Sequence, residues 1–114
     1  MRILSLHDTP ATSLGAGLSI EKRLLAGSNG VPQVMQFVRA HFQPGQVAPA
    51  HAHADWTELF YVESGEGTLT VDGTEHPLAP GLSFVVEPGE RHEIASAPAS
   101  ELVLVYLSLR TATA

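Results

Sequence analysis

The 114-residue sequence contains no cysteine and no long apolar run. Without cysteine the chain has no disulfides, no thiolate metal sites and no cysteine nucleophile. No apolar run approaches the roughly 20 residues that a membrane-spanning helix needs. A charge at Asp8 also comes too early for the apolar region of a signal peptide. We therefore expect a soluble, cytoplasmic protein with no membrane partner.

Positive charge is scarce as well. Six Lys and Arg residues stand against 12 Asp and Glu residues, the formal net charge is −6, and Lys22 is the only lysine. A nucleic-acid-binding surface needs clustered basic residues to neutralise phosphates, so we expect no nucleic-acid partner. The length suits one domain, and an apolar fraction of 44% can supply its core. We predict a single domain over residues 1–114, with a barrel at about 34–107 preceded by an N-terminal strand or extension at 1–33.

Ten Gly and eight Pro residues interrupt the whole chain, and short runs rich in Val, Leu, Phe and Tyr lie between them. Strand-length runs spaced by about ten residues predict an all-β sandwich or barrel of antiparallel strands. Asp72-Gly73 predicts a hairpin turn. The segment Ser19–Leu25 fits a short helical stripe or a strand, and its length favours a strand. The other predicted strands are Val34–Phe42, Thr57–Val62, Thr68–Asp72, Leu82–Val86, His92–Ala95 and Leu102–Leu109.

Three histidines and a glutamate stand out by their spacing. His51 and His53 are two residues apart, so an extended chain presents both on one face. Glu58 follows after four residues, which is enough for a turn to a neighbouring strand. His92 comes shortly after a Pro-Gly turn, at the start of another predicted strand. Imidazoles and a carboxylate are ligands for a divalent transition metal ion.

This spacing resembles that of the cupins. The first cupin motif, Gly-x5-His-x-His-x3or4-Glu-x6-Gly, is matched in full over Gly45–Gly65. In the second motif, Gly-x5-Pro-x-Gly-x2-His-x3-Asn, Glu87 and Ser96 replace the proline and the asparagine. The matched positions of the second motif are Gly81, Gly89 and His92.

The resemblance implies a double-sheet jelly-roll barrel that holds one divalent metal ion per subunit: iron, manganese, nickel, copper or zinc. The ligands carried over from the family are His51, His53, Glu58 and His92. The alternative is a metal-free cupin in which the histidines line a polar pocket. Glu87 and Ser96 remove no ligand, but they change the turn before His92 and a polar contact in the pocket.

Cupins include dioxygenases and other oxidoreductases, isomerases, lyases and members that only bind a ligand. A phosphosugar substrate would favour Lys or Arg near the mouth, and the chain has six such cations in total. An apolar lining suits a small organic molecule instead, and we expect it to include Phe60, Leu69, Phe84, Val86 and Ile94. We predict a mononuclear metal-dependent, dioxygenase-like oxidoreductase. The alternatives are a metal-dependent isomerase or lyase, and a non-catalytic module that binds a small molecule.

Several other residues could support such a site. Strand alternation places Phe60 and Val62 on the same side as Glu58. Arg39 or His41 could anchor a substrate or lie on a solvated outer face. Two further expectations concern loops: Asp55 and Trp56 at the mouth of the pocket, and Arg91 as an exposed charge.

Two predicted strands are apolar on both faces, namely the segments 59–62 and 102–107. An outer patch of Leu102, Leu104 and Tyr106 beside Leu59 and Tyr61 would be large enough to mark an interface. Either the segment Ile3–Leu25 covers this patch or a second copy does. We predict a homodimer to which the N-terminal segment contributes.

Overall fold

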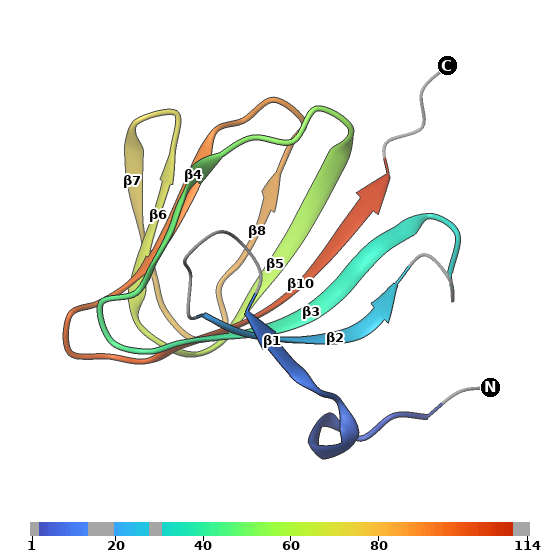
Figure 1. Cartoon of the computed structure of the whole chain (residues 1–114). Coiled ribbons are helices and arrows are strands. Elements are labelled where there is room, and N and C mark those ends of the chain that lie inside the picture. Colours follow the sequence, from blue (N-terminus) through green and yellow to red (C-terminus); the bar gives the residue numbers. More distant parts are fainter. Residues whose placement is uncertain (1–2, 14–19, 28–30, 111–114) are drawn as a thin grey trace.

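The computed structural model describes residues 3–13, 20–27 and 31–110, which form two antiparallel β-sheets (Figure 1). The larger sheet has the order β1-β2-β3-β10-β5-β8 and the smaller sheet the order β4-β9-β6-β7. Within these residues, no helix is long and apolar enough to cross a membrane. The elements are η1 (Leu6–Asp8), β1 (Ala11–Ser13), β2 (Glu21–Gly27), β3 (Val34–Phe42), β4 (Val47–His51), β5 (Trp56–Gly65), β6 (Gly67–Val71), β7 (Thr74–Leu78), β8 (Ser83–Val86), β9 (His92–Ser96) and β10 (Leu102–Arg110).

The predicted all-β, two-sheet architecture is confirmed, and each predicted strand is present with ends shifted by at most a few residues. The ambiguous N-terminal segment forms β2 from Glu21 onward, although Ser19 lies outside the described residues. The hairpin at Asp72-Gly73 joins β6 to β7. Both of its central residues have positive φ, 47° and 85°, as this tight turn requires. Strand β1 was not predicted separately.

The core lies between the two sheets. Strand β10 runs between β3 and β5, and its register pairs Tyr106 with both Val38 and Phe60. From the smaller sheet, Leu69, Leu78 and Ile94 complete the core. Side chains on the inner face of the larger sheet therefore meet those of the smaller sheet, and every second residue of β10 is buried here.

This register corrects one prediction. Leu102, Leu104 and Tyr106 do not form an outer patch, because all three are buried in the core. The opposite alternation faces outward: Leu107 is only half-buried and lies between Phe37 of β3 and Leu59 of β5. Val85 of β8 extends this outer row to a fourth strand. An apolar outer row therefore exists, made of different β10 residues from those expected.

Candidate metal centre

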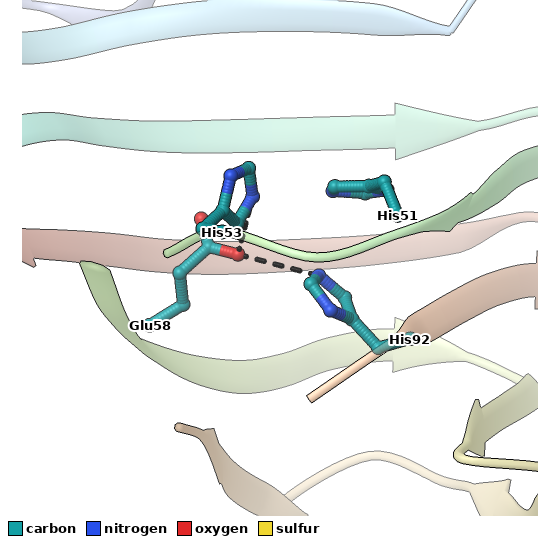
Figure 2. Close-up of side chains that lie close together, drawn as sticks. All are labelled: His51, His53, Glu58 and His92. Atoms are coloured by element: carbon teal, nitrogen blue, oxygen red, sulfur yellow. Dashed lines mark ion pairs between the residues drawn. The ribbon is translucent and has the colours of Figure 1, made fainter. Parts of the chain in front are cut away.

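The four predicted ligands come from both sheets. His51 ends β4, His53 follows it, and His92 begins β9, directly opposite His51 in the β4–β9 pair. Glu58 comes from β5 in the larger sheet and is buried, with 3% of its surface exposed. Figure 2 shows the Glu58 carboxylate pointing toward His53 and His92, with His51 nearby.

The geometry of the group fits one metal ion. The potential ligand atoms of the four residues all lie within 4.8 Å of one another. One carboxylate oxygen, Oε1 of Glu58, lies 3.4 Å from Nε2 of His53 and 3.4 Å from Nε2 of His92. Atoms bound to one ion at about 2.0–2.2 Å lie at most about 4.4 Å apart. Shifts of a few tenths of an ångström would therefore bring all four within bonding distance of a common centre.

Backbone carbonyls fix two of the imidazole rings. Nδ1 of His51 lies 2.8 Å from the carbonyl oxygen of Pro49, and Nδ1 of His92 lies 3.1 Å from that of Glu90. A carbonyl oxygen can only accept a hydrogen bond, so Nδ1 donates in both rings. In the neutral imidazole, Nε2 then carries the lone pair that a metal ion needs. Both rings are held in the tautomer that suits coordination through Nε2.

A ring contact holds the third imidazole. His53 stacks on Trp56, with ring centroids 4.4 Å apart and an angle of 20° between the planes. Trp56 therefore lies at the site, as expected for a residue between the ligands. Asp55 is exposed and does not line the cavity.

A row of polar side chains across three strands fixes Glu58. Ser108 of β10 is fully buried and donates a hydrogen bond to Oε2 of Glu58 at 2.5 Å. Gln36 of β3 donates in turn to the hydroxyl oxygen of Ser108 at 3.3 Å. The register pairs Gln36 with Ser108 and Ser108 with Glu58, so the three side chains share the inner face. Neither partner of Glu58 was predicted from the sequence, although Ser108 is the one polar residue inside an otherwise apolar strand.

The electrostatics of the group favour an ionised carboxylate. Burial by itself would raise the pKa of Glu58, but its contact with His92 and the hydrogen bond from Ser108 lower it overall. Burial would lower the pKa of His92, whereas its contact with Glu58 raises it overall. For His53, burial is the main cause of a lowered pKa, with Glu58 opposing it. Metal binding requires an ionised carboxylate and neutral imidazoles. The pKa shifts of Glu58 and His53 favour this state, whereas the raised pKa of His92 means that a metal ion must displace a proton there.

The four residues form part of the wall of a cavity of about 120 Å³. Phe60 and Ile94 line it as predicted, but Leu69, Phe84 and Val86 do not. Phe84 lies behind Phe60 and stacks on it, with centroids 4.6 Å apart. The remaining lining side chains are Lys22, Gln36, Ala40, Phe42, Ala48, Leu104 and Tyr106. The wall is thus largely apolar, as expected, with a few polar groups that the sequence analysis did not assign to it.

The basic side chains differ from the prediction in their positions relative to the cavity. Lys22 lines the cavity, so the small number of cations does not leave the pocket without one. Arg39 and His41 instead lie on the outer face, where Arg39 pairs with Glu63 at 2.7 Å and His41 contacts Glu101 at 3.0 Å. The solvated reading of these two residues is therefore the one the structure supports. Arg91 is exposed, as predicted.

The two departures from the second cupin motif have structural explanations. Residues 87–90 form a turn in which Glu90 N–H donates to the carbonyl oxygen of Glu87, with Gly89 at a φ of 84°. Glu87 uses its own N–H to bind the Glu90 carboxylate at 2.7 Å, a bond that proline could not make. Gly89 N–H reaches the carbonyl oxygen of His53 and so ties this turn to the ligand loop.

At the asparagine position, Ser96 is buried and bridges the connection between β3 and β4. Its hydroxyl donates to the carbonyl oxygen of Gln43 at 2.6 Å and accepts from the backbone N–H of Gln46 at 2.9 Å. Ser96 does not line the cavity. Its contacts therefore support the loop that precedes β4 and His51.

Residues 38–109 match the family model described as the cupin domain, which covers more than half of the sequence. The chain belongs to the cupin family. Its fold and its group of three histidines and one glutamate agree with that membership.

Three similar proteins have names that refer to different functions. Pectin degradation protein KdgF of Dickeya dadantii (strain 3937) is 25% identical over 89 residues, which covers 78% of this chain and 76% of KdgF. A predicted oxalate decarboxylase from Thermotoga maritima superposes with a TM-score of 0.86 at 20% identity, covering 96% of this chain and 99% of that one. The polyketide cyclase RemF from Streptomyces resistomycificus gives 0.81 at 18% identity, covering 100% and 87%. The structural matches show the shared fold.

Proposed function

We propose that this cupin is a mononuclear metal-dependent oxidoreductase that acts on a small organic molecule. The observation that carries the proposal is the convergence of His51, His53, Glu58 and His92 on the wall of a small, mainly apolar cavity. A divalent ion bound there would supply an open coordination position and, for iron, manganese, nickel or copper, a redox centre.

The chain's own residues support oxidation in two ways. Three histidines and one carboxylate would leave one or two positions open on an octahedral ion, where a substrate or dioxygen can bind. The apolar walls formed by Phe42, Phe60 and Leu104 would limit the entry of water and leave room for an organic substrate.

A metal-dependent lyase or isomerase is the second candidate. Such reactions move protons, and Lys22 and Tyr106 place two proton-bearing groups in the cavity wall. The similarity to a pectin degradation protein, which is 25% identical, also favours degradative chemistry of this kind.

Exchange of the metal separates the candidates. Protein stripped of metal and reloaded with Fe(II) or Zn(II) is assayed with a panel of small phenols, diketones, thiols and carboxylic acids. Oxidation requires oxygen uptake by the iron form and no turnover by the zinc form, because zinc has no redox chemistry. Turnover by the zinc form without oxygen would favour the lyase or isomerase, and tight binding without turnover a ligand-binding module. Failure of the protein to retain either metal would overturn the proposal.

A further inference from the structure

The only lysine of the chain lies in the cavity wall. Lys22 on β2 pairs in register with Ala40 of β3, which is buried and lines the same cavity. Lysine is rarely taken out of water because its charged amine is costly to desolvate. Burial lowers the pKa of Lys22, and the nearby charge of Glu58 partly opposes that shift. Half-burying the Lys22 amine therefore costs free energy, and a bound anion would compensate for that cost.

Glu58 is not a direct partner of this lysine. Oxygens of its carboxylate already contact Ser108, His53 and His92. Among the described residues no carboxylate lies within ion-pair distance of the Lys22 amine. Its one specific contact there is with the ring of Tyr106, whose centroid is 5.6 Å from Nζ. The amine is therefore available to pair with an anion that enters the cavity.

Tyr106 provides a second, independent observation. Its side chain is 6% exposed, and its ring stacks on Phe60 with centroids 5.0 Å apart. No hydrogen bond joins the Tyr106 hydroxyl to another described residue, and no buried side-chain atom of these residues is without a partner, so the hydroxyl itself is reachable by water. Tyr106 also lines the cavity. A ligand in the cavity can therefore accept a hydrogen bond from this hydroxyl.

We propose that Lys22 and Tyr106 together bind the carboxylate of a small organic acid, so that the substrate of the proposed enzyme is a small monoanion. A neutral substrate would leave the lysine unpaired in a largely apolar wall. A phosphate group bears up to two charges and usually takes several donors, whereas this end of the cavity offers one cation and one hydroxyl. A cavity of about 120 Å³ also limits the ligand to a few heavy atoms. Binding of a carboxylate by Lys22 and Tyr106 does not depend on the proposed function. That the bound acid is the enzyme's substrate does depend on it.

The test compares glycolate with glycolamide, which have nearly the same shape but differ in charge. Binding to metal-loaded protein is measured by calorimetry for the wild type, Lys22→Met and Tyr106→Phe. Lys22→Met keeps the apolar stem, and Arg110→Met is the matched control, because Arg110 is exposed at the end of β10 and the change in net charge is the same. We expect glycolate affinity to fall about 10-fold or more in Lys22→Met and several-fold in Tyr106→Phe. Glycolamide binding to these variants and glycolate binding to Arg110→Met should stay at the wild-type level.

Equal glycolate affinity in Lys22→Met and the wild type would overturn the inference, because the carboxylate would then bind the metal instead. A wild type that binds neither compound, or binds both equally, would also overturn it. A metal-independent measurement separates this failure from failure of the proposed function. The single lysine gives one Nζ signal in the NMR spectrum of metal-free protein, and that signal should shift with glycolate and not with glycolamide. Metal content, determined in parallel, tests the metal site alone.

Discussion

The two faces of the larger sheet differ in an unexpected direction. Across β3, β10 and β5, the inner face carries a polar row in which Ser108 and Glu58 are buried and Gln36 is half-buried. One residue further on, the outer face carries an apolar row that includes Phe37 and Leu59, which are 36% and 40% exposed. A sheet in a sandwich normally buries its apolar face and presents its polar face to water.

Because the polar row is on the inner face and the apolar row on the outer face, we infer that each row has a function besides stabilising the fold. Burying a carboxylate costs free energy unless hydrogen bonds and charges compensate. Ser108, His53 and His92 provide that compensation for Glu58. The neighbouring inner row, Val38, Tyr106, Phe60 and Phe84, is an ordinary core with stacked aromatic rings. The contrast separates a site within the barrel from a candidate interface on its outside.

The largest effect should come from removing a ligand on the inner side. His53→Ala should lose most bound metal and keep a β-rich circular dichroism spectrum, because His53 is not part of the hydrophobic core. His76→Ala is the control, since His76 is exposed on β7. Full metal occupancy in His53→Ala, measured by elemental analysis, would show that the ion is bound elsewhere.

Acid should empty the inner site. Metal binding needs neutral imidazoles and so releases protons, which means that occupancy must fall as pH falls. The raised pKa of His92 lets protons compete with the ion there first, whereas the lowered pKa of His53 delays protonation of that ring to lower pH. We therefore expect the loss between about pH 6.5 and 4.5, with recovery on neutralisation. Occupancy that stays constant down to about pH 4 would contradict ligation by His51, His53 and His92.

A smaller effect should follow from the partner of Glu58. Ser108→Ala removes the hydrogen bond to Oε2 and leaves the carboxylate less well oriented. Loss of such a supporting bond typically weakens metal binding about 10- to 100-fold. Competition with a chelating dye measures the change, and Ser83→Ala on the exposed edge of β8 is the control. Unchanged affinity in Ser108→Ala would mean that the polar row is not needed to position Glu58.

The smallest effect on the metal site is expected from a substitution on the outer face. We propose that two copies associate through the apolar row around Leu59, so that light scattering gives a mass near twice 12.1 kDa. Leu59→Lys should yield monomers without affecting metal content. Val47→Lys is matched to it, because Val47 is also 40% exposed but belongs to the smaller sheet. A wild type that is monomeric at micromolar concentration would contradict the proposal.

The ligand group was accessible from the sequence because its signals are local. The alternation of His51 and His53, the short spacing to Glu58 and the Pro-Gly turn before His92 each involve only a few residues. The spacing of strands and turns likewise predicted an all-β fold.

What the sequence did not predict depends on pairing between distant strands. Both alternations of β10 are apolar, so hydrophobic pattern alone could not decide which face Leu104 and Tyr106 would occupy. Ser108 meets Glu58, 50 residues away in sequence, only through the β10–β5 register. Lys22 reaches the cavity because β2 pairs with β3. A single sequence does not specify such registers.

The central claim is that one ion is bound by His51, His53, Glu58 and His92, and anomalous diffraction at a metal absorption edge tests it most directly. Crystals of protein loaded with zinc should give one strong peak within about 2.0–2.2 Å of the three Nε2 atoms and of a Glu58 carboxylate oxygen. The absence of a peak there in protein with one bound zinc per chain, or a peak at other residues, would contradict the account.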